Sequence, residues 1–269
     1  MRGPISHWAI RHHTRYIMAF KASLNYIIFC LDNGVHLRLT FKKLIKKIIK
    51  DPPNTIFNLS SRRNYFFLKK LLNNKENIRI LFVGSGYERG YGVNCLGEDL
   101  LKKSINLDIK PMGIVDIVGD VHHLPFKNET FDAVIAQAVI CYLKNPFMAI
   151  SEIKRILKKG GYIYTEIAFI HRYDGADLFR CTKKGLRELF KEFSLIDEGI
   201  VGGPSSAFSN ILVKYLAILF SCNIDFLFNS FDTLFRWLLC PLKYLDLILK
   251  NNKFSSIIAH SHYFLGRKK

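Results

Sequence analysis

Residues 78–86 (IRILFVGSG) constrain the fold more than any other part of the chain. They predict a buried strand that leads directly into a glycine turn, where a ligand can approach the backbone closely. Further along, residues 115–126 (VDIVGDVHHLPF) predict a second buried strand, which ends at Asp120 and a loop. Two apolar strands that each end in a glycine-rich or polar loop favour an open parallel sheet, in which ligands bind beyond the carboxyl ends of the strands. The sequence therefore predicts a site for a nucleotide-like cofactor at that edge.

Strand and helix patterns alternate from residue 78 onward, which predicts a doubly wound, mostly parallel α/β sheet of about seven strands. Asn145 and Pro146 predict the start of one helix, since asparagine caps a helix and proline suits its first position. Gly160 and Gly161 predict its end. The expected strands lie near 79–83, 105–109, 114–118, 132–137, 161–168, 194–202 and 257–267, and the expected helices near 93–104, 146–158 and 182–193.

Positive charge is concentrated before the part of the chain that is expected to form the sheet. Residues 1–79 hold 16 Lys/Arg and 3 Asp/Glu, whereas residues 80–269 hold 24 and 19, within a net charge of +18. We therefore predict a basic helical N-terminal extension, residues 1–77, and a main domain, residues 78–269. The asymmetry favours contact with an anionic surface, lipid or nucleic acid. A general lysine bias is the equally weighted alternative.

The extension is expected to end in an amphipathic helix over residues 39–50. Its apolar residues recur three and four positions apart, and lysines fill the other face. Asp51 and the two prolines after it end the helix, because proline cannot continue one. Packing on the sheet with a solvated lysine face is favoured over binding to a membrane surface. The apolar positions are Phe41, Leu44, Ile45, Ile48 and Ile49.

An apolar helical insertion, residues 206–250, precedes the last expected strand. Pro241 breaks its helical pattern, and charged residues interrupt it too often for a membrane span. Three roles stay open: a lid over the ligand site, a homodimer face, or a surface that joins helix 39–50 in holding the protein on an anionic bilayer. The charged residues are Lys214, Asp225, Asp232 and Arg236, and the apolar residues at roughly helical spacing are Phe226, Leu227, Phe231, Leu234, Phe235 and Leu238.

Cysteine usage and the N-terminal residues indicate the compartment. The six cysteines include no CxxC pair and no Cys/His cluster with ligand spacing, so we expect no disulfide framework, no metal site and a reducing compartment. Lys21 interrupts an apolar stretch over residues 16–31, and no clear cleavage site follows, which disfavours a signal peptide or a membrane-spanning start. We therefore expect a cytoplasmic protein, with the inner face of a membrane as the alternative location.

Three further motifs follow the glycine turn: GDVHHLPF at 119–126, FDAV at 131–134 and SEIKRILKKGG at 151–161. In this order and spacing, they make the chain resemble the class I, Rossmann-like S-adenosylmethionine-dependent methyltransferases. The most similar group includes the methyltransferases of ubiquinone and menaquinone biosynthesis. The resemblance covers residues 80–202, and the strand expected at 257–267 completes it. It implies S-adenosylmethionine as the cofactor and a small-molecule or lipid-like methyl acceptor.

The glycine turn and the end of the second strand supply the first expected cofactor contacts. Gly84, Ser85 and Gly86 allow close approach, and the free N–H groups of the following helix start suit the cofactor's carboxylate. A tight turn is the alternative role of these residues. A carboxylate at Asp108 can accept hydrogen bonds from both ribose hydroxyls, as in dinucleotide-binding folds. A turn or capping aspartate is the alternative for Asp108.

The resemblance implies further contacts at the next two strand ends. Asp120 would accept a hydrogen bond from the adenine amino group, and the backbone of Val121 would meet the ring. Gln137, at the tip of the fourth strand, would border the sulfonium of the cofactor, with a buried structural amide as an equal alternative. His122 and His123 are expected on the adenine side.

The polar, aromatic loop at 171–182 is the expected acceptor side of the site. His171 could remove a proton from a hydroxyl or amine nucleophile, since its pKa lies near neutrality. Arg180 could hold an anionic substrate. A structural loop in which Asp177 or Thr182 caps the next helix is the alternative, and it is favoured for Arg180. Methyl transfer depends on positioning and water exclusion more than on a universal base, so no catalytic residue is assigned.

Two positions depart from the family pattern. Phe82 stands where an acidic residue is usual, and Glu88 stands where a third glycine is common. The missing acid removes a partner of the cofactor's amino group, which supports a rival interpretation, a non-catalytic binding or scaffold protein with this fold. In addition, the segment between Asp108 and Asp116 is too short for a helix, so one crossover is expected to be a loop.

A nucleic-acid methyltransferase is the second rival, because the N-terminal part is strongly basic. Base methyltransferases carry an Asn/Asp-Pro-Pro-Tyr motif at the fourth strand, where this chain has residues 136–138 (AQA). Nucleic acid is therefore disfavoured as a partner. Methyl transfer from S-adenosylmethionine to a small-molecule or lipid-like acceptor is the leading expectation.

Overall fold

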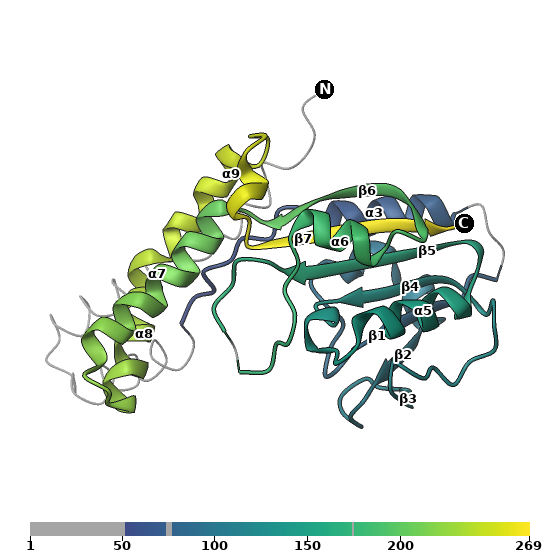
Figure 1. The fold of residues 1–269 in the computed structure, drawn as a ribbon, viewed down its shortest axis with the longest axis horizontal. Coiled ribbons are helices and arrows are strands. Elements are labelled where there is room, and N and C mark those ends of the chain that lie inside the picture. Colours follow the sequence, from purple (N-terminus) through teal and green to yellow (C-terminus); the bar gives the residue numbers. More distant parts are fainter. Residues whose placement is uncertain (1–51, 74–76, 174) are drawn as a thin grey trace, which may run out of the picture. The chain divides into compact units, whose positions relative to one another are not determined.

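The computed structural model describes residues 52–73, 77–173 and 175–269 (Figure 1). Residues from Pro53 onward form one compact unit. Its seven-stranded sheet has the order β3-β2-β1-β4-β5-β7-β6, and neighbouring strands are parallel except at β7, which is antiparallel to β5 and β6. The predicted doubly wound, mostly parallel α/β fold is confirmed. The strands are β1 (Ile80–Val83), β2 (Ile105–Asp108), β3 (Ile117–Val118), β4 (Phe131–Gln137), β5 (Leu157–Ala168), β6 (Phe193–Gly202) and β7 (Ser261–Lys268).

Six of these strands end at the same edge of the sheet, which we call the carboxyl edge. Strands β1 to β5 are parallel to one another. Strand β6 has the same direction, because β7 runs antiparallel to both β5 and β6. Ser261, the first residue of β7, pairs with Ala168 at the end of β5 and with Gly202 at the end of β6. The loops after all six strands therefore begin at the carboxyl edge.

Helices cover both faces of the sheet, with α3 on one face and α5 and α6 on the other (Figure 1). Asn145 caps α5 by accepting a hydrogen bond from the N–H of Met148 (3.1 Å), and Thr182 caps α6 through the N–H of Gly185 (3.0 Å). The sequence predicted the Asn145 cap, and Thr182 was one of the two caps, with Asp177, in the alternative considered for its loop. The helices are α3 (Ser61–Leu72), α4 (Glu98–Lys102), α5 (Pro146–Ile156) and α6 (Lys183–Leu189), with 3-10 helices η1 (Val93–Leu96) and η2 (Ile140–Tyr142).

Helix α3 belongs to the core of the sheet unit. Its Tyr65, Leu68 and Leu72 are fully buried in an apolar cluster on one face of the sheet. The other face packs a second cluster against α5 and α6. Because α3 contributes this much buried apolar surface, the compact unit begins before the boundary that we predicted at residue 77. The expected helix over 39–50 lies outside the described residues.

Several predicted boundaries differ from the structure. The helix expected over 93–104 is divided into η1 and α4 by Gly97, whose φ of 92° a helix cannot hold. Helix α5 ends at Ile156, and β5 begins there because Leu157 pairs with Phe131 of β4. Strand β3 has two residues, and the last strand starts at Ser261 rather than 257. The connection between β2 and β3 is a loop, as predicted.

The predicted insertion is present as a set of helices between β6 and β7, which we call the helical arm (residues 204–258). Helices α7 and α8 lie side by side (Figure 1). Among the described residues, no helix is long and apolar enough to cross a bilayer. The arm consists of α7 (Pro204–Ser221), α8 (Asp225–Leu239), η3 (Cys240–Leu245), α9 (Asp246–Leu249) and η4 (Ser255–Ile258).

A buried carboxylate fixes the root of the arm. Asp246 accepts hydrogen bonds from the N–H groups of Ser205 (2.7 Å) and Ser206 (3.0 Å) and from the Ser206 hydroxyl (2.6 Å). These N–H groups open α7, where a negative charge also meets the positive end of the helix dipole. Only glycine fits at Gly203, because a Cβ there would lie 2.5 Å from the Asp246 carboxylate.

We predict that Asp246→Ala lowers the free energy of unfolding by about 2–3 kcal/mol, since it leaves buried donors of α7 without an acceptor. Urea unfolding followed by circular dichroism measures this. Asp225→Ala, which removes an exposed aspartate from the first turn of α8, is the matched control and should change stability far less. Equal losses in the two variants would contradict the capping role.

The start of β7 carries a buried histidine. Burial, followed by the charges of His171 and Arg180, lowers the pKa of His260 to about 3. In the unfolded chain this imidazole has its ordinary pKa near 6.5. Between these two pKa values the unfolded chain binds a proton that the folded protein does not bind. The free energy of unfolding is therefore highest above the pKa of the unfolded chain and decreases as the pH falls below it.

We therefore predict that His260 alone lowers the free energy of unfolding by about 2 kcal/mol as the pH falls from about 7 to about 5. The His260→Gln variant should show a correspondingly flatter dependence of unfolding free energy on pH, whatever its stability at neutral pH. His123→Gln, at an exposed position, should keep the slope of the parent protein. Parallel slopes for His260→Gln and the parent would show that His260 is not buried in its neutral form.

Candidate active site

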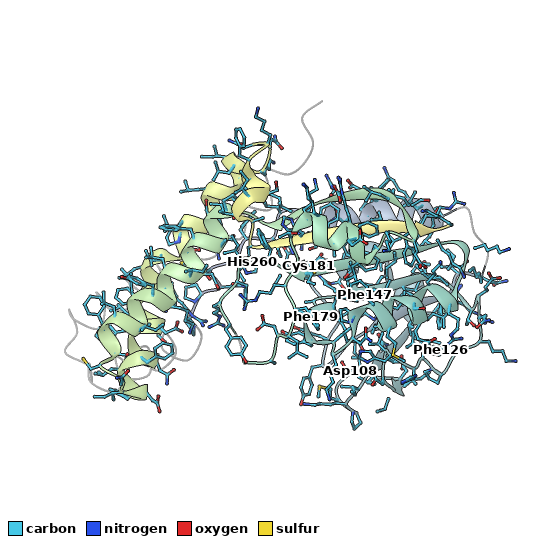
Figure 2. All side chains as sticks on the ribbon, in the orientation of Figure 1. Asp108, Phe126, Phe147, Phe179, Cys181 and His260 are labelled. Carbon is cyan, nitrogen blue, oxygen red and sulfur yellow. The ribbon has the colours of Figure 1, made fainter. Side chains whose placement is uncertain are left out.

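A pocket with a volume of about 690 Å³ opens at the carboxyl edge. Four of the predicted cofactor residues line it: Gly84, Asp108, Asp120 and Val121. Figure 2 shows Asp108 toward the same end of the sheet as Phe179 and Cys181, which belong to the loop after β5. The pocket is also lined by Val83, Leu107, Ile109, Lys110, Gly119, His122, His123, Ala138, Val139, Tyr142, Leu143, Lys144, Asn145 and Met148.

The glycine turn reaches this pocket through Gly84, whereas Ser85 and Gly86 do not line it. Gly84 has a φ of 68°, and a Cβ there would lie 2.3 Å from a methyl group of Val139, so only glycine fits. Gly86 also has a positive φ, but a Cβ would meet nothing within 4 Å, so open space lies beside it. Ser85 is buried, and its hydroxyl has no hydrogen-bond partner among the described residues. An open space and an unpartnered buried hydroxyl are what a turn that accepts a polar ligand requires.

Asp108 links the ends of β1 and β2. Its two carboxylate oxygens accept hydrogen bonds from the N–H groups of Gly86 (3.0 Å) and Lys110 (3.1 Å). The N–H of Gly86 therefore binds Asp108 in this structure. Each carboxylate oxygen has a second lone pair, which leaves acceptor capacity for two hydroxyl groups in the pocket. The turn role and the ligand role of Asp108 are compatible.

Asp120 is held as an anionic acceptor. Its Oδ1 accepts from the N–H of His122 (2.9 Å) and lies 2.5 Å from His122 Nδ1. His122 Nε2 accepts from the N–H of Asn145 (3.2 Å), so the imidazole proton sits on Nδ1 and is donated to Asp120. The backbone hydrogen bond from His122 is the main cause that lowers the pKa of Asp120. An ionised carboxylate at the pocket wall suits an amino group of the ligand.

The segment after β4 supplies the part of the pocket that sequence reasoning missed. Tyr142, Leu143 and Met148 give it apolar and aromatic walls, which suit a flat ring. His122 ties this segment to the β3 loop through the backbone of Asn145. The helix cap at Asn145 was the available signal, because a cap next to a strand end brings the following helix start to the carboxyl edge.

Gln137 does not line the pocket. Its Oε1 accepts from the Tyr65 hydroxyl (2.8 Å), and its Nε2 donates to Glu166 (2.8 Å) and to the Tyr91 carbonyl (3.3 Å). Both ends of the amide are thus engaged, as in the structural alternative considered for this residue. Gln137 nevertheless occupies the tip of β4, as expected.

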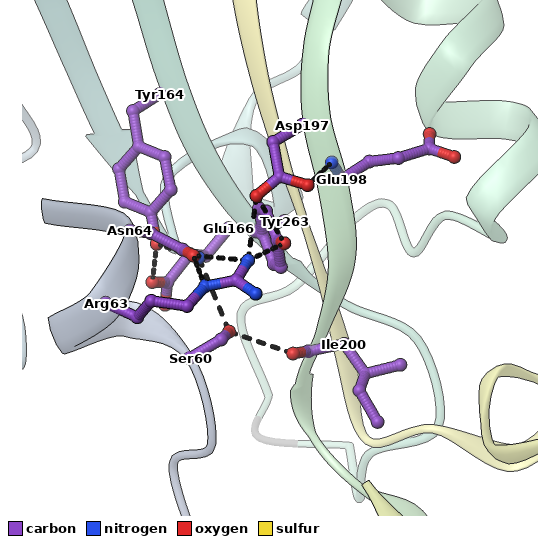
Figure 3. Close-up of polar contacts among 9 residues, drawn as sticks. All are labelled: Ser60, Arg63, Asn64, Tyr164, Glu166, Asp197, Glu198, Ile200 and Tyr263. Atoms are coloured by element: carbon purple, nitrogen blue, oxygen red, sulfur yellow. Dashed lines mark hydrogen bonds and ion pairs between the residues drawn. The ribbon is translucent and has the colours of Figure 1, made fainter. Parts of the chain in front are cut away.

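Glu166 is the centre of a buried polar network that the sequence did not predict. Figure 3 shows its contact with Tyr164, beside Asn64 of α3. Its carboxylate accepts hydrogen bonds from the Ser61 hydroxyl (2.5 Å), the Tyr164 hydroxyl and Gln137. Asn64 of α3 also donates to the Tyr164 oxygen (3.2 Å). Burial is the main cause that raises the pKa of Glu166 and of Tyr164. The network fixes α3 against the ends of β4 and β5, next to the glycine turn.

The predicted acceptor residues belong to the loop after β5 and do not line the pocket. Arg180 donates to Asp177 (2.5 Å) and to the backbone carbonyls of His171 and Arg172. These contacts give Arg180 the structural role that we favoured for it. The ring of His171 lies edge-on to His260, with centroids 4.8 Å apart.

Phe82, which stands where the family usually has an acidic residue, is a residue of the apolar core. It is buried in the apolar cluster on the α3 side, and the guanidinium of Arg89 lies 4.9 Å from the centre of its ring. Arg89 also donates to Asn106 (2.8 Å) and Ser104 (2.9 Å). Glu88 lines a separate depression together with Arg62 and Tyr91. Position 82 therefore contributes to the core and offers no carboxylate to a ligand's amino group.

Comparison with known proteins identifies relatives of this region. Residues 83–165 match the family model described as a methyltransferase domain. The chain is similar to sarcosine/dimethylglycine N-methyltransferase of Aphanothece halophytica, with 26% identity over 134 residues, 44% of this chain and 48% of that one. It is 36% identical over 104 residues to probable phthiotriol/phenolphthiotriol dimycocerosates methyltransferase 2 of Mycobacterium ulcerans, 33% of this chain and 39% of that one. The chain thus spans less than half the length of these relatives.

Among solved structures, the 4+2 cyclase SpnF superimposes with a TM-score of 0.51 at 17% identity, over 84% of this chain and 92% of SpnF. At this identity the likeness concerns the fold alone. The family match, residues 83–165, contains every residue that lines the pocket. Residues 83–165 are thus a methyltransferase domain, and they lie within a seven-stranded sheet of the Rossmann-like methyltransferase fold.

Proposed function

We propose that the chain binds S-adenosylmethionine in the pocket at the carboxyl edge and transfers its methyl group to a small-molecule or lipid-like acceptor. The observation that carries this proposal is the meeting of Asp108 and Asp120 with the glycine turn in one pocket. Two relatives are named as methyltransferases of sarcosine or dimethylglycine and of phthiotriol or phenolphthiotriol dimycocerosates. Both relatives support such an acceptor for this chain.

In this proposal the residues of the pocket bind and orient the cofactor and exclude water from it. Asp120 accepts from the adenine amino group, Asp108 accepts from the ribose hydroxyls, and Tyr142 covers the ring. When bound, the cofactor would supply a methyl group on a sulfonium. An acceptor nucleophile would bond to this methyl carbon in line as the carbon–sulfur bond breaks, and S-adenosylhomocysteine would leave. Alignment and exclusion of water supply much of the rate of such a displacement. His171 remains our candidate for removing a proton on the acceptor side, and Arg180 for positioning that loop.

A non-catalytic protein with the same fold is the second candidate. The burial of Phe82 favours it, because the cofactor's amino group has no carboxylate at that position. The unpartnered hydroxyl of Ser85 and the open space beside Gly86 favour the first candidate, since they leave a polar group and room for a ligand at the glycine turn. Direct binding measurements separate the two candidates.

We predict that Asp108→Ala and Asp120→Ala each weaken S-adenosylmethionine binding by about 1–3 kcal/mol, which is about 5-fold to 150-fold in Kd. Each change removes an acceptor from a ligand group that the pocket has desolvated. Isothermal calorimetry with S-adenosylmethionine and S-adenosylhomocysteine measures the effect. Asp99→Ala, an exposed aspartate of α4, is the matched control and should bind as the parent does.

The parent protein itself decides between the two candidates. If it binds neither compound at high micromolar concentration, the non-catalytic candidate is correct. If it binds both but the two aspartate variants bind equally well while remaining folded, the cofactor lies elsewhere. A salt-dependent gel shift with DNA or RNA would restore the nucleic-acid alternative.

A further inference from the structure

The helical arm has an inverted distribution of polarity. In a helix hairpin of a water-exposed surface, large apolar side chains pack inward and charges face out. Within α8, the side chain that is buried is a charged one, Asp232. It forms ion pairs with Lys214 of α7 (2.7 Å) and with Arg236 (3.0 Å). Three of the four charged residues of the hairpin thus pair with one another around a buried carboxylate.

The inward side of α7 is made of small and polar residues. Ser206, Ser209, Val213, Ala217 and Ser221 are buried at spacings of three and four along the helix. Aromatic rings of the hairpin also contact one another, Phe220 with Phe231 and Phe235. Small residues and paired charges at a helix contact are typical of helices in an apolar medium, where backbones approach closely and charges avoid the surroundings.

The outward side of α7 is a continuous stripe of large apolar residues. Ile218 is 64% exposed and Tyr215 is 61% exposed, and both lie on the stripe of Phe208 and Ile211. Helix α8 adds Phe226, which is 77% exposed, and Leu238. The arm exposes these further large apolar side chains: Leu219, Phe220, Ile224, Leu234, Trp237, Tyr244, Leu245, Leu247, Ile248, Phe254, Ile257 and Ile258. An exposed apolar surface of this extent marks an interaction site.

Exposed lysines accompany the apolar residues near the root of the arm. Lys250 and Lys253 follow α9, beside Ile248 and Phe254, which are 77% and 60% exposed. Residues 204–258 carry five Lys/Arg and three Asp, and two of these aspartates are buried. The exposed charge of the arm is therefore mainly positive, which complements anionic headgroups and opposes a second basic copy of this chain, whose net charge is +18.

The arm is rooted at the same edge as the pocket. Helix α7 starts directly after Gly202, the end of β6, and the carboxyl edge also carries the loops of the pocket. Arg172, in the loop after β5, donates its N–H to Asn210 of α7 (3.1 Å). The expected acceptor side of the site and the apolar arm are therefore in direct contact.

We propose that the helical arm lies in the surface layer of an anionic lipid bilayer, with α7 and α8 parallel to the membrane plane, and that the methyl acceptor is a lipid-like molecule taken from this layer. The second part of this inference depends on the proposed function. The apolar stripe occupies the outer acyl region, Lys250 and Lys253 contact the headgroups, and the carboxyl edge faces the membrane.

Vesicle flotation of the full-length protein, without cofactor, tests the membrane contact. We expect the protein to float with phosphatidylcholine vesicles that contain roughly one third phosphatidylserine and to float less with phosphatidylcholine alone. The double variant Ile211→Gln and Ile218→Gln should bind about tenfold or more weakly, since it removes two apolar groups that already face water in the folded protein. Lys250→Gln with Lys253→Gln should lose only the preference for anionic vesicles.

The matched control is Phe66→Gln with Leu195→Gln, two exposed apolar residues of α3 and β6 outside the arm. It should float as the parent does. The proposal is overturned if the parent stays unbound with both vesicle types, or if the arm variant floats like the control. If the parent elutes as a dimer that the Ile211/Ile218 variant dissociates, a second copy covers the arm and the membrane proposal fails.

The proposed function and the membrane contact are tested by separate measurements. Flotation without any binding of S-adenosylmethionine in calorimetry would contradict the proposed function and leave the membrane contact standing. Binding of the cofactor without flotation would contradict the membrane contact alone. When both bind, labelled methyl transfer into the chloroform-extractable fraction of the vesicles is the expected result, and label confined to water-soluble products would overturn the lipid-like acceptor.

Discussion

The antiparallel strand β7 determines how the functional parts of this protein are arranged. Since β7 runs between β5 and β6, its first residue, Ser261, pairs with the last residue of each neighbour. This pairing gives β6 the direction of the parallel strands and brings its end to the carboxyl edge. The glycine turn, the acidic strand ends, the loop after β5 and the root of the helical arm therefore share one edge. A parallel β7 would have started at the opposite edge, so the end of the arm would have been far from the pocket.

A second constraint joins the N-terminal part of the described chain to this edge. Glu166 at the end of β5 accepts hydrogen bonds from Ser61 of α3 and from Gln137 of β4, and Tyr65 of α3 completes the contact to Gln137. A buried carboxylate is costly unless its oxygens are satisfied, and removal of one partner leaves the others unpaired. The network thus specifies one position of α3 on the sheet. It also keeps the amide of Gln137 away from the pocket.

The sequence predicted those parts of the site that depend on a strand and the residue after it. Asp108, Asp120 and the glycine turn could be located because the end of a buried strand is visible as a local pattern and because parallel strands share an edge. The role of Gln137 could not be predicted, since Tyr65 and Glu166 are distant in sequence and three-dimensional packing alone brings them together. Tyr142 and Met148 were missed for another reason, since the cap at Asn145 was a local signal that this segment begins at the carboxyl edge and it was not used. The contribution of α3 to the core was hidden by its basic composition.

The helical arm illustrates a limit of periodicity itself. Apolar residues at helical spacing predict an amphipathic helix, but they do not reveal whether the apolar side faces the protein or the surroundings. In α7, the small residues Ser209 and Ala217 are buried and the large apolar residue Ile218 is exposed. Helix α5 has the opposite arrangement, since its Ile150 and Ile153 are buried. Because α5 and α7 belong to one compact unit, the same solvent cannot favour both arrangements. The reversed order in α7 is consistent with an apolar environment on its outer side, and the root of the arm at the carboxyl edge brings that environment next to the loop that we expect to meet the acceptor.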